Sequence, residues 1–176
     1  MTTKTTLSVA QLLEKMATDP NFPTLAELST LSDLTLSGQA QVRREWMTIP
    51  EDRRNLAVKQ LITTSETELS LHLGRFLRVV LEDESSRNRA LAVAGLWEET
   101  DEALIGPLVD MLYNDPSEDV RAGAAEAMGF YVLAGELDEI VPAQAMRIEE
   151  ALLSILHSAA EPLAVQCRAL ESIAYS

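Results

Sequence analysis

The sequence predicts an all-α protein in which short helices pair into hairpins and the hairpins stack. Apolar residues recur at helical spacing from Val42 onward, for example at Leu73, Phe76, Leu77 and Val80, with no convincing alternating strand pattern between them. Turn and helix-start residues divide this pattern into helices of about 12 to 18 residues. Two segments also repeat one another without gaps at an offset of 32 residues, which is typical of stacked helical arrays.

Helix-start signals place several of the elements. Two helices, near residues 9–17 and 25–31, are expected to cover the N-terminal end of the array. Residues 48–51 read Thr-Ile-Pro-Glu, a capping box in which threonine accepts from the amide three residues on while the glutamate reaches back. Asp115 followed by Pro116 predicts another helix start, with the aspartate as cap and the proline at the first helical position.

A repeated helix-turn-helix pattern occupies the rest of the chain. Asp83 aligns with Asp115 and Arg89 with Arg121, both at an offset of 32 residues. A third copy near the C-terminus keeps the outline at an offset of 45 residues, and a more degenerate pair precedes the others at residues 39–64. Each helix pair alone is too small to bury its apolar face, so stacking is required.

The stretch NDPSEDVRAGAAEAMG at residues 114–129 resembles the consensus of short bacterial HEAT-like repeats. The resemblance is strongest over residues 104–133 and good over residues 73–98. It implies a right-handed α-solenoid and a hydrogen-bonded ladder between successive repeats, made by a loop aspartate and the arginine six positions later. The matching residues are Asp83 and Arg89, then Asp115 and Arg121, whereas the third copy has Ala160 and Gln166, so the ladder is expected to end before the C-terminus.

The predicted fold is therefore an all-α, right-handed α-solenoid of about four HEAT-like helical hairpins with an N-terminal helical cap. Helices rich in alanine and glycine let neighbours approach closely, while larger apolar side chains fill the space between layers. The cap is expected over residues 1–36, and the hairpins over approximately residues 37–65, 67–98, 101–135 and 142–176.

Composition limits the compartment in which the protein works. The 176 residues, 47% of them hydrophobic, suffice for one domain with a core. The single cysteine, Cys167, makes no internal disulfide and no thiolate metal cluster, which is typical of a reducing compartment. We therefore expect a cytoplasmic protein. The longest uncharged stretch, residues 151–160, is about half of the roughly 20 apolar residues that a bilayer span needs, so no membrane association is predicted.

Charge is distributed unevenly along the chain. The formal net charge is −14, with 11 basic and 13 acidic residues up to Glu98 but 3 basic and 15 acidic residues after it. Phosphate contacts come from Lys and Arg, so a nucleic-acid partner is disfavoured. The acidic later hairpins are able to steer a basic partner. The alternative is a solvated acidic face that only keeps the protein soluble.

No motif in the sequence carries catalytic, metal or cofactor chemistry. His72 and His157 have no metal-ligand spacing and are expected at the surface or half-buried. Cys167 is expected to pack among small residues. Packing is also the expected role of Trp46 and Trp97, with an exposed binding anchor as the alternative. No catalytic residue, cofactor site or metal site is predicted.

These observations lead us to expect a non-enzymatic scaffold or adaptor that binds another protein through the second helices of the hairpins. Two enzyme classes with HEAT-like repeats are the alternatives. A phycobilin lyase acts on an acidic tetrapyrrole, for which the acidic second half is a poor match, and an alkylpurine DNA glycosylase needs a basic surface. The expected contact residues are Arg87, Glu118, Asp119, Ala122 and Glu126.

The last predicted helix, residues 162–176, has no polar cap over its apolar face. Solenoids need their terminal apolar faces covered. We therefore expect self-association through this C-terminal end, or its coverage by a partner.

Overall fold

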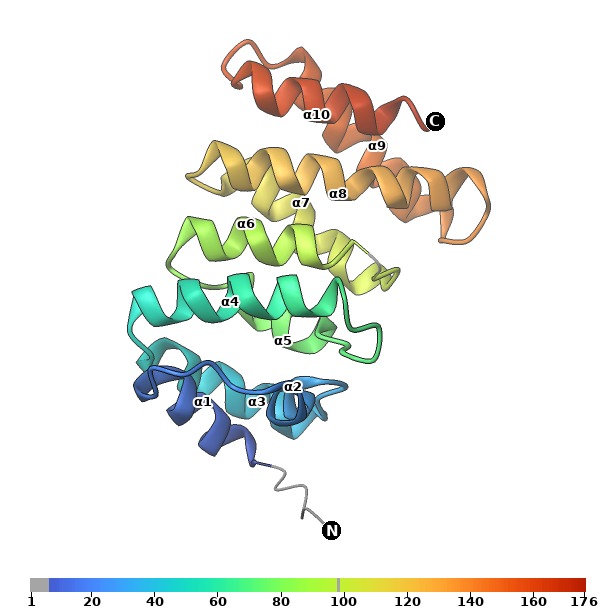
Figure 1. Ribbon diagram of the computed structural model, residues 1–176. Helices are drawn as coiled ribbons and strands as arrows, with labels where there is room; N and C mark the ends of the chain where they lie inside the picture. The colour runs from blue at the N-terminus through green and yellow to red at the C-terminus, as the bar shows by residue number, and fades with distance from the viewer. Residues whose placement is uncertain (1–6, 98) are drawn as a thin grey trace. The chain divides into compact units, whose positions relative to one another are not determined.

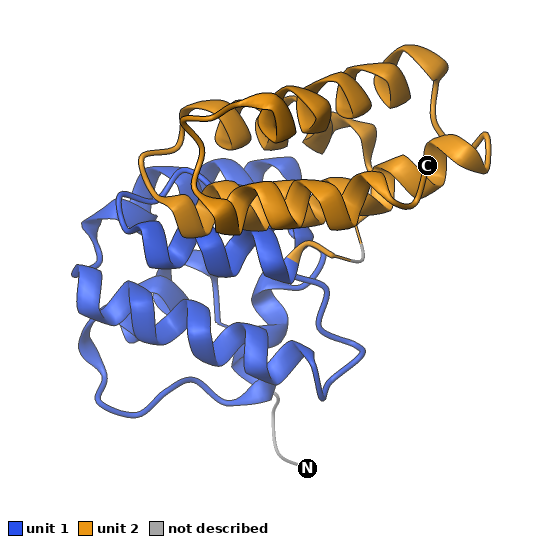
Figure 2. Cartoon of the chain, turned by 90° about the horizontal axis from the view of Figure 1, so that it is seen from above, with its two compact units in different colours: residues 1–95 blue, residues 96–176 orange. Residues whose placement is uncertain are grey.

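The computed structural model describes residues 7–97 and 99–176. These residues form ten α-helices and three short 3-10 helices, and no strand occurs among them (Figure 1). The predicted all-α class is thus confirmed. The chain divides into two compact units, Met1–Gly95 and Leu96–Ser176 (Figure 2).

The first unit holds the two predicted N-terminal helices and the helices that follow them. Contacts join helices that alternate along the chain: α1 lies against α3, α3 against α5, and α4 against α6. The helices are α1 (Val9–Thr18), α2 (Leu25–Leu28), α3 (Leu36–Glu45), α4 (Glu51–Ser65), α5 (Gly74–Val80) and α6 (Ser86–Gly95), with 3-10 helices η1 (Ser29–Leu31) and η2 (Trp46–Thr48).

The two N-terminal helices are held by caps and an ion pair. At α2, Thr24 donates its amide to Glu27 Oε2 at 2.8 Å, and Lys15 of α1 donates to Glu27 Oε1 at 2.7 Å. The hydrogen bond from Lys15, followed by those from Thr24, lowers the pKa of Glu27 to about 2. A capping box at Ser8 and Gln11 starts α1.

The second unit contains two helix pairs. Helix α7 packs against α8, and α9 against α10, while α7 also contacts α9 and α8 also contacts α10. Figure 1 shows α8 and α10 side by side. The helices are α7 (Ile105–Asn114), α8 (Glu118–Glu136), α9 (Pro142–His157) and α10 (Leu163–Ile173), preceded by the 3-10 helix η3 (Glu102–Leu104).

Both helix starts that we predicted from residues 48–51 and 115–116 differ in detail. The hydroxyl of Thr48 donates to the Glu45 carbonyl at 2.6 Å, because Thr48 ends η2, so it does not cap α4. Asp115 Oδ1 accepts from the Ser117 amide at 2.9 Å and shapes the loop, while Ser117 is the N-cap of α8. Pro116 therefore lies before the cap and not at the first helical position.

Positions that align between the repeats share their burial. Two sets of positions that the offsets of 32 and 45 residues relate are completely buried. One set contains Asn88, Val120 and Val165, and the other contains Ala92, Ala124 and Ala169, each 0% exposed. The second helix of each copy therefore turns the predicted side inward.

Candidate functional site

A fully enclosed charged group of the first unit is the carboxylate of Asp83, between α5 and α6. Arg54 of α4 donates from Nε to Asp83 Oδ2 at 2.9 Å and from Nη2 to Oδ1 at 3.2 Å. Their side chains are 5% and 0% exposed, respectively. Trp46 Nε1 donates to Oδ2 at 2.7 Å, Asn88 Nδ2 to Oδ2 at 3.1 Å, and the Ser85 amide to Oδ1 at 2.9 Å.

These donors decide the charge state of the group. Burial acts to raise the pKa of Asp83, but the hydrogen bonds from Arg54, Ser85, Trp46 and Asn88 outweigh it and hold the pKa below its ordinary value. Asp83 is thus an ionised carboxylate whose oxygens are filled by donors of the protein itself. Its role is to join α4 to the loop between α5 and α6, not to react with a ligand.

The two arginines of the implied ladder each bind the loop that precedes their own helix. Arg89 and Arg121 each donate from Nη1 to the main-chain oxygen of the loop aspartate six residues earlier, at 2.8 Å in both cases. Arg121 also donates from Nε to Glu161 Oε2, 3.1 Å away in the loop before α10. Contrary to our expectation, an arginine–carboxylate link therefore reaches the last helix pair, because Glu161 supplies the carboxylate that Ala160 lacks.

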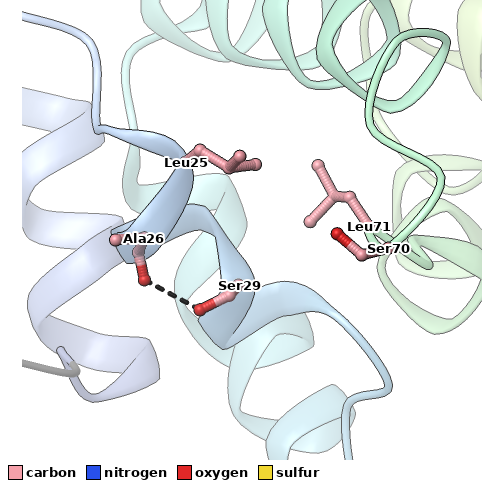
Figure 3. A pocket seen from close by; sticks show the side chains of 5 residues that line it. All are labelled: Leu25, Ala26, Ser29, Ser70 and Leu71. Carbon is pink, nitrogen blue, oxygen red and sulfur yellow. Dashed lines mark hydrogen bonds between the residues drawn. The ribbon is translucent and has the colours of Figure 1, made fainter. Parts of the chain in front are cut away.

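A small pocket lies in the first unit between α2 and the segment before α5 (Figure 3). Its volume is about 240 Å³, and it is lined by Leu25, Ala26, Ser29, Ser70 and Leu71. The Ser29 hydroxyl is already engaged, since it donates to the Ala26 carbonyl at 2.7 Å. Ligand sites usually enclose roughly 300–1,000 Å³ and hold a few convergent polar groups. This pocket offers neither the size nor the polar groups.

The structure places four of the five predicted contact residues together. Glu118, Asp119 and Glu126 are exposed on α8, and Ala122 is half-buried on the same helix. Arg87 is exposed on α6, in the other unit. The candidate surface is therefore built on α8 and does not include Arg87.

The exposed face of α8 continues into apolar residues that the sequence analysis missed. Along α8, Asp119, Glu126, Phe130 and Leu133 are separated by seven, four and three residues. This spacing keeps their side chains on one side of a helix with 3.6 residues per turn. Phe130 and Leu133 are 48% and 41% exposed. The face thus changes from acidic at the start of α8 to apolar at its end.

Three exposed aromatic side chains lie on or beside α8 near this apolar end, and we call them the aromatic row: Trp97, Phe130 and Tyr175. Trp97 is 57% and Tyr175 58% exposed. The rings of Trp97 and Phe130 lie 6.3 Å apart between centroids, tilted by 47°. Tyr175 lies against α8, since a Cβ built on Gly129 would be 3.3 Å from Tyr175 Cδ2. The lack of a side chain at Gly129 therefore lets this ring approach the residue before Phe130.

Local contacts hold the row in place. The Tyr131 hydroxyl lies 3.1 Å from the carbonyl oxygens of both Glu99 and Asp101, as donor. These hydrogen bonds fix Glu99 and Asp101 against α8. On the other side, Ser172 of α10 donates to the Glu126 carbonyl at 3.4 Å. Contacts on both sides of α8 thus hold the neighbours of the aromatic row in place.

Two carboxylates, Glu126 and Glu171, border the aromatic row, and we call them the acidic pair. Arg168 lies between them, with Nε 3.7 Å from Glu126 Oε2 and Nη1 2.7 Å from Glu171 Oε2. The hydrogen bond to Glu171 and the attraction of both carboxylates raise the pKa of Arg168. The surface therefore combines rings, carboxylates and one exposed guanidinium.

The burial of the tryptophans, the histidines and the cysteine agrees only in part with the predictions from the sequence. Trp46 is 1% exposed, as expected for packing, whereas Trp97 follows the alternative of an exposed side chain. His72 and His157 are exposed. Cys167 is exposed too, so the expectation that it packs is wrong: it lies on the outer side of α10, where Leu163 and Leu170 are also exposed.

Across residues 7–97 and 99–176, no group of three His, Cys, Asp or Glu side chains is arranged to hold a metal ion. Within the same ranges, every helix is too short or too polar to cross a membrane. The fold defines the protein as all-α, with ten helices among the described residues. Comparisons with family models, curated proteins and solved structures find no match for the chain.

Proposed function

We propose that this protein is a non-enzymatic interaction module, a cytoplasmic scaffold or adaptor that binds a basic segment of another protein through the aromatic row and the acidic residues of α8 and α10. The observation that carries the proposal is the contact between the exposed rings of Trp97 and Phe130, with the exposed Tyr175 against the same helix α8 and Glu126 one turn before Phe130. Single exposed apolar residues are ordinary on protein surfaces. Aromatic residues that cluster at a surface often contribute most of the binding free energy of a protein interface.

The charge around the row sets the sign of the partner. Beyond Glu98, the chain has 15 acidic and only 3 basic residues. Two of the three are engaged: Arg121 pairs with Glu161, and Arg168 with the acidic pair. Such an excess attracts basic partners from a distance and speeds their association, most strongly at low salt.

We further propose that the helix pairs belong to a right-handed, HEAT-like α-solenoid. Alternate helices pack in each unit, α3 with α5 and α4 with α6, then α7 with α9 and α8 with α10. Aligned inward positions share complete burial. This stacking supports the proposal, because solenoids present their second helices as an extended binding surface.

A random peptide library displayed on phage tests the function directly. We expect selection on the whole protein to enrich peptides that combine basic residues with an apolar or aromatic residue. Phe130→Ala and Glu126→Lys should each weaken the binding of the selected peptides by about fivefold or more, since the loss of an interface anchor costs more than about 1 kcal/mol. Fluorescence anisotropy measures these affinities.

Matched controls come from exposed residues of the first unit. Leu69→Ala removes an apolar side chain that is 84% exposed, more than Phe130 at 48%, and Glu14→Lys reverses an exposed charge on α1. Both should leave the affinity within about twofold, because neither belongs to the unit that holds the aromatic row. Selection of acidic peptides, or equal binding by the control and the Phe130→Ala variants, would contradict the proposal.

A further inference from the structure

An acid–aromatic pair on α8 lies beside a second carboxylate and a second ring near the end of α10. Glu126 precedes Phe130 by four residues on α8, and residues four apart on a helix share a face, with Cβ atoms about 5–6 Å apart. Glu171 lies on α10, and Tyr175 lies in the turn that follows this helix. Helix α8 packs against α10, Arg168 contacts both Glu126 and Glu171, and Tyr175 lies against Gly129. These residues therefore share one surface at the contact between α8 and α10.

A guanidinium already lies between the two carboxylates of that surface. It belongs to Arg168, whose nitrogens are 3.7 Å from Glu126 Oε2 and 2.7 Å from Glu171 Oε2. Arg168 is 46% exposed and each glutamate 63%. Ion pairs as exposed as these are weak, because water competes for both partners. The acidic pair thus accommodates a guanidinium, and it binds the guanidinium of Arg168 only weakly.

Arginine and lysine would gain different amounts from this surface. The planar guanidinium of arginine donates several hydrogen bonds to carboxylates and stacks on aromatic faces, whereas the lysine ammonium is a compact, strongly hydrated charge. The rings of Phe130 and Tyr175 are exposed next to the acidic pair. A bound arginine could therefore stack and pair at once, which a lysine cannot do equally well.

We propose that this surface selects arginine over lysine in its partner, and that the partner's guanidinium takes the place between Glu126 and Glu171 that Arg168 holds in the free protein. The inference rests on the proposed function and adds the residue type that the surface recognises. Arg168 is then an internal competitor. Its removal should leave the acidic pair open to the partner.

Nona-arginine and nona-lysine, labelled with the same fluorophore, test the selectivity because they have equal charge and length. In anisotropy titrations of the whole chain, nona-arginine should bind at least about fivefold more tightly. Phe130→Ala combined with Tyr175→Ala should bring the ratio of the two affinities close to one. Arg168→Ala should tighten the binding of nona-arginine by about threefold, by removing the competing pair.

Glu149→Ala with Glu150→Ala is the matched control for Glu126→Ala with Glu171→Ala, since both double variants remove two negative charges from the second unit. Only Glu126→Ala with Glu171→Ala should abolish the preference for arginine. If the two peptides bind equally well, and the Glu126 and Glu171 variant binds neither, the selectivity is overturned but the proposed function stands. A preference that survives the loss of both rings would also overturn it. If neither peptide binds, both the selectivity for arginine and the proposed function are contradicted.

Discussion

Arg54→Ala lowers the free energy of unfolding by about 3–5 kcal/mol, the usual cost of removing one partner from a buried ion pair. The change leaves the carboxylate of Asp83 fully enclosed without its opposing charge. Trp46, Asn88 and the Ser85 amide still donate to it, but none of these groups has a charge. Urea denaturation followed by circular dichroism measures the loss.

Arg43→Ala is the matched control. Arg43 pairs with Glu82 at 2.6 Å, but the two side chains are 54% and 61% exposed, so its loss should cost less than about 1 kcal/mol. Combining Arg54→Met with Asp83→Asn should cost less than the sum of the two single changes, because no charge remains buried alone. Equal, small losses in Arg54→Ala and Arg43→Ala would show that the buried pair contributes nothing special.

The same group predicts a pH dependence. Because the pKa of Asp83 is lowered in the folded protein, its contribution to stability is present above the pKa of an unfolded aspartate and disappears as the pH falls through the lower, folded value. Asp83→Asn should therefore flatten the part of the stability profile that lies below about pH 4.

Phe76→Ala is expected to destabilise the protein by about 3–5 kcal/mol, as do other truncations of a buried phenylalanine. Phe76 is completely buried on α5 and meets the Trp46 ring edge-on, with centroids 5.2 Å apart and planes at 89°. Its loss leaves a cavity and also removes a support of the ring that donates to Asp83. The midpoint of thermal unfolding should fall accordingly.

Phe130→Ala provides the comparison within the same chain, because this ring is 48% exposed. It should cost less than about 1 kcal/mol, since much of its surface already meets water. A Phe130→Ala variant that is as unstable as Phe76→Ala would assign the aromatic row to the core and would contradict its role as a binding surface.

Much of the helical architecture could be predicted because the signals that specify it are local. The 3.6-residue apolar period places the helices, and α1 and α2 begin at the predicted residues. The cap of α4 was less predictable, because the hydroxyl of Thr48 has two possible partners nearby. It donates to Glu45 within η2, and no sequence pattern indicated η2.

The two tryptophans show why burial was harder to predict. Trp46 is buried because its indole N–H finds an acceptor in Asp83, 37 residues along the chain. Trp97 is exposed, and its ring lies against the exposed ring of Phe130. Each tryptophan comes within two residues after the end of a helix, α3 or α6, so the local sequence does not tell which of the two is buried. Contacts between segments distant in the sequence decide it.

A usable signal existed for Arg54. It follows Thr48 by six residues, the spacing that separates Arg89 from Asp83 in the next repeat. Extending the repeat register into the degenerate first pair would have identified it as the arginine of the ladder. By contrast, the aromatic row joins Trp97, Phe130 and Tyr175 from three separate segments, and no single stretch of sequence shows that they meet.

The most direct test of the binding surface is a ¹H–¹⁵N NMR titration of the whole chain with a peptide selected from the displayed library. The two indole N–H signals serve as reporters, since Trp97 belongs to the aromatic row and Trp46 lies buried beside Asp83. We predict shifts in the Trp97 indole and in the amides of Phe130 and Tyr175, with the Trp46 indole unchanged. Shifts spread over acidic residues of both units, with the Trp97 indole unchanged, would contradict the proposed surface.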